Sequence, residues 1–160
     1  MLKLTKKADY GLMAMKHLAE HPQPGACSAK DLAEAYRIPR ELLAKILQRL
    51  VRAGLLKSQH GSHGGYVLAR NPATISAFEV IRTIDGPLFI TSCVTVRGNC
   101  VQHERCTIKE PMHKVNSSIE EVLRRITIAD MAEDTPGGSG PGQGERQPQG
   151  HKSVELVRIT

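Results

Sequence analysis

One helical stretch, closed by a glycine and followed by a glycine-rich hairpin, constrains the fold of this chain most strongly. From Pro39 to Ala53, apolar residues recur at three- and four-residue intervals, so the pattern predicts a helix with one apolar face. Pro39 fits the first position of that helix, and Gly54 fits a left-handed cap after it. The opposite face is mostly basic and carries Arg40, Glu41, Ala44, Lys45, Gln48, Arg49 and Arg52.

The residues around this helix indicate a winged helix-turn-helix. A shorter helix, residues 29–36, precedes it after a brief turn, and a short helix before a longer basic one is the arrangement that places the second helix in the DNA major groove. An ordinary helical hairpin is the alternative. Residues 55–59 and 66–69 then read as two strands joined by the tip His60-Gly-Ser62-His63-Gly-Gly, which favours a β-wing and DNA binding.

Composition favours a helical core elsewhere in the chain. With no Trp, two Phe and three Tyr, the core must be aliphatic. Patterns and capping residues predict further helices at about residues 5–20, 77–85, 110–125 and 128–132. The expected fold is therefore mainly α with a small β-wing. We expect a winged helix-turn-helix domain (1–70), a linker helix with a cysteine loop and a dimerisation helix (71–134), and a flexible Gly/Pro-rich tail (135–160).

Charge is unevenly distributed along the chain. Residues 1–70 hold 12 Lys and Arg against 5 Asp and Glu, a net of +7, whereas residues 71–160 hold 10 against 11, a net of −1. This excess suits contact with a polyanion such as double-stranded DNA, although a solvated basic face without a partner is the alternative. We expect Arg40, Glu41, Ala44, Lys45 and Gln48 to face base edges. Phosphate contacts are expected from Lys6, Lys7, Arg49, Arg52, His60, Ser62 and His63.

The helix at residues 110–125 has an apolar stripe that one small domain offers little surface to cover. The stripe consists of Val115, Ile119, Val122, Leu123 and Ile126, spaced at i, i+4, i+7, i+8 and i+11. A homodimer formed through this helix would bury the stripe and set two winged domains to read half-sites roughly 34 Å apart. Packing within one chain is the alternative.

Three of the four cysteines lie close together, as Cys93, Cys100 and Cys106, in a C-x6-C-x5-C array. Thiolates are soft ligands for zinc, copper(I) or iron–sulfur clusters, and the array lacks the close cysteine pairs of common zinc sites. Evenly spaced thiols suit a cluster better. Reduced structural cysteines or redox-sensing cysteines without a cofactor are the alternative. Cys27 stands apart, and we expect it to be a small buried residue.

Three features in order, LTKKADYGLMAM, GSHGGYVL and the three-cysteine loop before a long helix, resemble the winged-helix iron–sulfur transcription regulators, which include IscR-like and NsrR-like proteins. The resemblance covers about residues 1–133. It implies a homodimeric DNA-binding repressor or activator whose operator affinity depends on a cluster held by Cys93, Cys100 and Cys106.

At the position of the fourth cluster ligand, this chain differs from the IscR-like proteins. IscR-like proteins have a histidine three residues after the last cysteine, where this chain has Lys109, and a lysine ammonium is no ligand. In NsrR-like proteins an acidic residue near the start of the first helix reaches the cluster from the partner subunit, which implies Asp9. An acid at a helix start is also favourable by itself. His103 and His113 are further candidates, and the cluster is 2Fe-2S or, alternatively, 4Fe-4S.

These observations lead to one expected function and one alternative. The expected protein is a regulator that senses iron–sulfur status, redox state or nitric oxide. We expect it to be cytoplasmic, because no apolar run is long enough for a signal peptide or a membrane span. The alternative is a cluster-free regulator whose thiols sense oxidants. We do not expect an enzyme, since no Ser-His-Asp set, phosphate loop or nucleotide motif accompanies the thiols.

Overall fold

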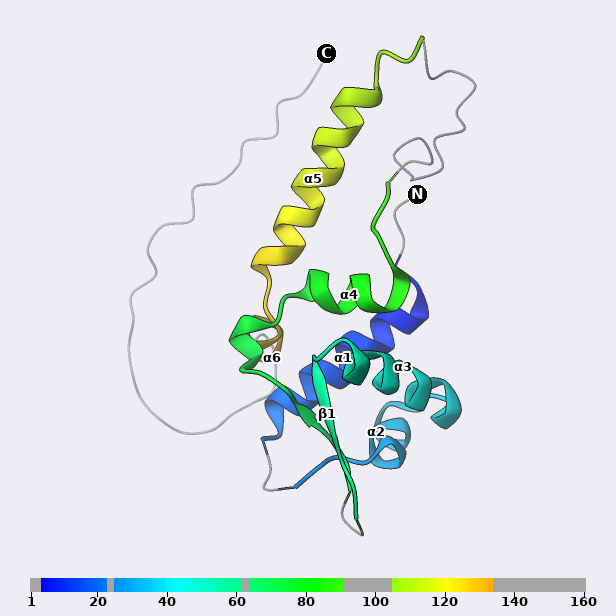
Figure 1. Cartoon of the computed structure of the whole chain (residues 1–160), viewed down its shortest axis with the longest axis vertical. Helices are drawn as coiled ribbons and strands as arrows, with labels where there is room; N and C mark the ends of the chain where they lie inside the picture. Colours follow the sequence, from blue (N-terminus) through cyan, green and yellow to red (C-terminus); the bar gives the residue numbers. More distant parts are fainter. Residues whose placement is uncertain (1–3, 23–24, 62–63, 91–104, 134–160) are drawn as a thin grey trace, which may run out of the picture.

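Helices dominate the computed structural model, which describes residues 4–22, 25–61, 64–90 and 105–133 (Figure 1). In chain order the elements are α1 (Lys6–Glu20), α2 (Ala29–Tyr36), α3 (Arg40–Arg52), β1 (Leu56–Gln59), β2 (Gly65–Leu68), the 3-10 turn η1 (Pro72–Thr74), α4 (Ala77–Asp85), α5 (Lys109–Arg125) and α6 (Ile128–Glu133). Strands β1 and β2 pair antiparallel, with Leu56 opposite Leu68. The expected helical fold with a β-wing is confirmed.

Polar side chains fix where the helices begin. Ser28 accepts a hydrogen bond from the backbone N–H of Asp31 at the start of α2, and Ser76 and Glu79 form a reciprocal capping box at the start of α4.

Pro39 is not the first residue of α3, which corrects the expectation from the sequence. With ψ at 121° it lies before the helix as its N-cap, and its carbonyl accepts the first helical bond, from Leu43 N at 3.0 Å.

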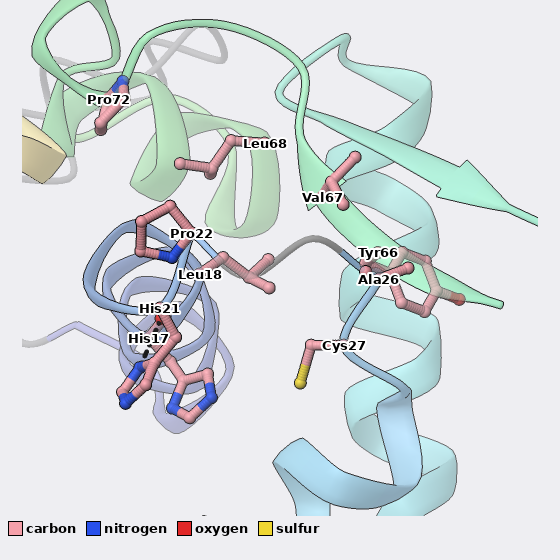
Figure 2. A pocket seen from close by; sticks show the side chains of 11 residues that line it. His17, Leu18, His21, Pro22, Ala26, Cys27, Tyr66, Val67, Leu68 and Pro72 are labelled. Atoms are coloured by element: carbon pink, nitrogen blue, oxygen red, sulfur yellow. Dashed lines mark hydrogen bonds between the residues drawn. The ribbon is translucent and has the colours of Figure 1, made fainter. Parts of the chain in front are cut away.

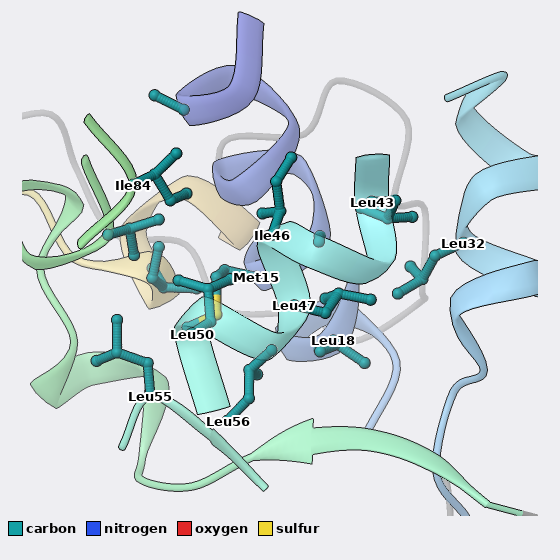
Figure 3. Packing of buried hydrophobic residues seen from close by; sticks show 14 of the residues in the cluster. Met15, Leu18, Leu32, Leu43, Ile46, Leu47, Leu50, Leu55, Leu56 and Ile84 are labelled. Carbon is teal, nitrogen blue, oxygen red and sulfur yellow. The ribbon is translucent and has the colours of Figure 1, made fainter. Parts of the chain in front are cut away.

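The apolar face of α3 lies at the centre of the core (Figure 3). Leu43, Ile46, Leu47 and Leu50 are all at most 2% exposed, in agreement with the sequence pattern. They pack with residues that come from every other part of the winged domain, namely Met15 and Leu18 of α1, Leu32 of α2, and Leu55 and Leu56 around β1. Burying such aliphatic side chains contributes roughly 1.5–3 kcal/mol each.

The same core continues into α4 and α6. Val80, Ile84 and Ile128 are at most 5% exposed and belong to the cluster that contains α3. Two backbone hydrogen bonds, Ala77 N to Ile126 O at 2.8 Å and Ile128 N to Ile75 O at 2.9 Å, join the start of α4 to the end of α5. The hydrophobic core therefore includes residues on both sides of the expected domain boundary at residue 70.

Helix α5 extends from this body, away from the wing (Figure 1). At its C-terminal end, the guanidinium of Arg124 lies 3.8 Å from the ring centroid of Phe78 in α4. At its middle, Asn116 is 6% exposed and accepts a hydrogen bond from Ile90 N at 3.2 Å. Within the described residues, no helix combines the length and apolar character needed to span a bilayer.

Candidate nucleic-acid interface and cysteine loop

The outward face of α3 is available to a partner. Helices α2 and α3 and the wing lie at the end of the molecule opposite the far end of α5 (Figure 1). Every residue predicted to contact base edges lies on this helix, and all are exposed except Ala44, which is half-buried. The side of α3 that carries them is opposite the buried leucines, because the helical period separates the two sets.

Three predicted cationic contacts are close to one another. Lys7 of α1 and Lys45 and Arg49 of α3 line one small hollow of about 70 Å³. Arg49 has a structural role as well, because its guanidinium donates to the carbonyl of Ile84 in α4 at 3.1 Å. The structure therefore brings the start of α1 beside the predicted recognition helix, and it ties that helix to α4.

Gly65 of the wing allows strand β2 to pack closely against the segment before α2. A Cβ on Gly65 would lie 2.4 Å from the backbone oxygen of Cys27, so the close approach of β2 to that segment requires glycine. Here Cys27 N donates to Tyr66 O at 3.2 Å, and Tyr66 N donates to Cys27 O at 2.9 Å. His60 is exposed at the end of β1, whereas Ser62 and His63 lie outside the described residues.

Two exposed cations near this face were not among the predicted contacts. Arg37 ends α2 in a left-handed conformation (φ 52°), in the turn that leads to α3. Lys57 lies on β1, where the three residues after Leu56 are exposed. Their positions in the sequence could have identified them, because Arg37 lies just before the predicted recognition helix and Lys57 follows it in the wing, where cations can reach phosphates.

Of the expected cluster ligands, only two lie within the described residues. Cys106 is a half-buried free thiol two residues before Ile108, the N-cap of α5. Cys93, Cys100 and the further candidate His103 lie outside the described residues. His113 is half-buried on α5. The described residues contain no group of three His, Cys, Asp or Glu side chains placed to hold a metal ion.

Asp9, the other expected ligand, is exposed in the first turn of α1. The start of α1 is attached to the end of α4, since Thr5 N and Thr5 Oγ1 both donate to the carboxylate of Asp85, the first of them at 3.1 Å. The segment that contains the cysteines follows α4 in the sequence. Asp9 therefore lies near the end of α1 that contacts the last residue of α4.

Comparison with known proteins identifies the family. A model of the Rrf2 family, described as an iron-dependent transcriptional regulator, matches residues 4–134. The chain belongs to the Rrf2 family. Among curated relatives, the regulator CymR of Bacillus subtilis is 33% identical over 136 residues, which are 85% of this chain and 94% of CymR. The regulator NsrR of Shouchella clausii is 30% identical over 131 residues, 81% of this chain and 88% of NsrR.

Solved structures agree with this assignment. T. potens IscR superposes with a TM-score of 0.68 at 36% identity, over 88% of this chain and 94% of that one. CymR, the global cysteine regulator of B. subtilis, gives a TM-score of 0.68 at 33% identity, over 84% of this chain and 99% of that one. This Rrf2 protein is thus a winged-helix DNA-binding transcriptional regulator, and its relatives are named as regulators, which are not enzymes.

Proposed function

We propose that an iron–sulfur cluster controls operator binding by this Rrf2 regulator. The observation that carries the proposal is the array of Cys93, Cys100 and Cys106 in the segment between α4 and α5, in a family described as iron-dependent. Soft thiolates fit such a group, and Cys106 is a free thiol at the entrance to α5. Asp9 of the partner subunit would be the fourth ligand. When bound, the cluster supplies a centre that responds to oxidants, nitric oxide or iron supply.

A homodimer formed through α5 belongs to this proposal. Val115 is 45% exposed, Val122 is 57% exposed and Ile126 is 36% exposed, so these three residues of the apolar stripe are open to solvent in a single chain, whereas Ile119 and Leu123 are half-buried. The stripe borders a shallow groove of about 420 Å³ between Lys114 and Leu123. A second copy of α5 offers a matching apolar surface, which makes a two-fold symmetric pairing its natural cover.

Contacts at the end of α4 support a path from the cysteine loop to DNA. The loop follows directly after α4, whose last turn holds α3 through Ile84 O and Arg49 and holds α1 through Asp85 and Thr5. Ile90, which precedes the loop, donates its backbone N–H to Oδ1 of Asn116 in α5, the helix that follows the loop. Because the loop is attached at both ends, a change in its conformation would alter how α4 lies against α5, and with it the spacing of the two recognition helices.

A cluster-free thiol sensor is the second candidate, and one finding favours it. CymR of B. subtilis, at 33% identity, is described as a global cysteine regulator, and Staphylococcus aureus CymR has been solved in an oxidized form, with a TM-score of 0.65 at 26% identity. Under this alternative the same three cysteines would change state by forming disulfides or sulfenic acids.

DNA-binding titrations separate the two candidates. An operator selected from random duplexes would be titrated with iron-reconstituted protein and with chelator-treated protein, both without oxygen. The proposal predicts at least a tenfold difference in Kd, which Cys106→Ser abolishes and the neighbouring substitution Thr107→Ser preserves. Equal affinities in these two states, together with a response of metal-free protein to peroxide, would replace the cluster with the thiol sensor.

A further inference from the structure

A cavity of about 570 Å³ lies between the end of α1, the segment before α2, and strand β2 (Figure 2). Its volume is within the ~300–1,000 Å³ typical of small-molecule sites. Most of the wall is apolar. Its lining residues are Leu18, Pro22, Ala26, Val67, Leu68 and Pro72, together with His17, His21, Cys27, Tyr66 and Gly25.

Two histidines and a cysteine supply the polar part of this cavity. The rings of His17 and His21 stack with their centroids 4.3 Å apart, and Nδ1 of His17 is 3.0 Å from the hydroxyl of Tyr36. Burial, together with the nearby His21, lowers the pKa of His17, which favours the uncharged imidazole. Burial also raises the pKa of the Cys27 thiol, which stays protonated. No Lys, Arg, Asp or Glu is among the residues that line the cavity in the described part of the chain.

The cavity also spans the joint between the helix-turn-helix and the wing. Cys27, which lines it, is paired through two backbone hydrogen bonds with Tyr66 of β2, and Gly65 permits the close approach. Leu68 points into the cavity from the wing side, and Leu18 and Pro22 lie opposite it on the α1 side (Figure 2). A molecule bound here would touch both the wing and the helix that supports it.

We propose that this cavity binds a small uncharged organic molecule with an apolar body and one hydrogen-bonding group, and that its occupancy changes DNA affinity by shifting the wing. The apolar walls and the absence of charged side chains among the described lining residues select against ions. The ring nitrogen of His17 that does not face Tyr36, and the Cys27 thiol, would meet the hydrogen-bonding group. Wing position matters because His60, at the end of β1, is one of the predicted phosphate contacts. The site is distant in sequence from the cysteine loop and does not depend on the cluster.

The test uses 1-aminoanthracene, an uncharged fluorescent probe with an apolar body and one amine. The full-length protein should bind one molecule per chain with saturable fluorescence enhancement. Leu68→Trp fills the cavity and should weaken binding at least tenfold. Met13→Ser alters a separate hollow beside Met131 of α6 instead, and should leave the probe affinity within twofold. Unchanged affinity in the Leu68 variant, or loss of binding in the Met13 variant, would overturn the assignment.

Two further measurements keep the test decisive. The chain has no Trp, so the emission of the introduced indole reports whether the Leu68→Trp protein has folded. If it has not, His17→Phe takes its place, because it keeps the ring volume but removes the hydrogen-bonding nitrogens, and it should weaken probe binding about fivefold. Saturating probe should change the Kd for the selected operator at least threefold in the native protein. An unchanged Kd would refute the link to the wing.

Discussion

Gly11 lies inside α1, where this helix meets α4, and replacing it with alanine would test how tightly the two helices must pack. A Cβ at position 11 would be 2.1 Å from Cδ1 of Ile84 and 3.5 Å from Cγ2 of Ile46. Helix propensity alone favours alanine over glycine by about 1 kcal/mol. Overpacking a buried site costs about 1–3 kcal/mol, and Ile84 is only 5% exposed. We therefore expect Gly11→Ala to lower the free energy of unfolding by up to about 2 kcal/mol.

The second substitution in this test removes the clashing atom. Ile84→Val deletes Cδ1 and should cost about 0.5–1.5 kcal/mol by itself. In the double variant the added methyl occupies the vacated space, so the two changes should compensate with a coupling of about 1–3 kcal/mol. Urea denaturation followed by circular dichroism, at one fixed protein concentration, gives the four values. Ile81→Val is the matched control, since Ile81 lies on the same helix and is 2% exposed.

Additive effects of the two substitutions would exclude a clash between their side chains. If Gly11→Ala and Ile84→Val add to within about 0.5 kcal/mol, the two side chains do not compete for one space. A similar coupling between Gly11→Ala and Ile81→Val would show a general loosening of α4 rather than a specific contact. Either outcome would contradict the close crossing of α1 and α4.

Three other predictions concern DNA binding, assembly and pH. Lys45→Ala and Gln48→Ala should each weaken operator binding by about 1–3 kcal/mol while changing non-specific binding less, in fluorescence anisotropy titrations. Arg52→Ala, at an exposed predicted phosphate contact, should weaken both kinds of binding alike. Val122→Glu should convert the proposed α5 dimer to monomers in sedimentation velocity, and a persisting dimer would exclude the α5 interface. The pKa of His17 is lowered by burial and by His21, so the unfolded chain takes up a proton that the folded chain disfavours. The melting temperature should therefore fall as pH drops through about 6.5, less steeply in His17→Gln.

Elements with a strong local pattern can be predicted from the sequence. The helical period of α3 is enough to identify both its buried leucines and its exposed polar face. Ser76 and Glu79 predict the start of α4 through a capping box that the structure contains. Pro39 lies one residue outside the helix that its pattern predicts, because proline's fixed φ suits both the N-cap and the first helical position.

Contacts between distant segments cannot be inferred from local patterns. The sequence predicts a buried Cys27, but this residue is half-buried. It lines a cavity whose wall also includes residues of α1 and β2. The wing glycines suggest room for a phosphate backbone, whereas at Gly65 the backbone of Cys27 requires the space. Arg49 is predicted to contact phosphates, and its bond to Ile84 O adds a role that only the tertiary fold creates.

An anaerobic visible absorption spectrum of the purified protein, with iron and acid-labile sulfide assayed on the same sample, tests whether the cysteine array holds an iron–sulfur cluster. We expect a brown protein with matched iron and sulfide. Asp9→Ala should alter the spectrum or release the iron, and Cys106→Ser should abolish both. A colourless protein that contains neither element after attempted reconstitution would contradict the cluster and favour the thiol sensor, and it would leave the DNA-binding assignment intact.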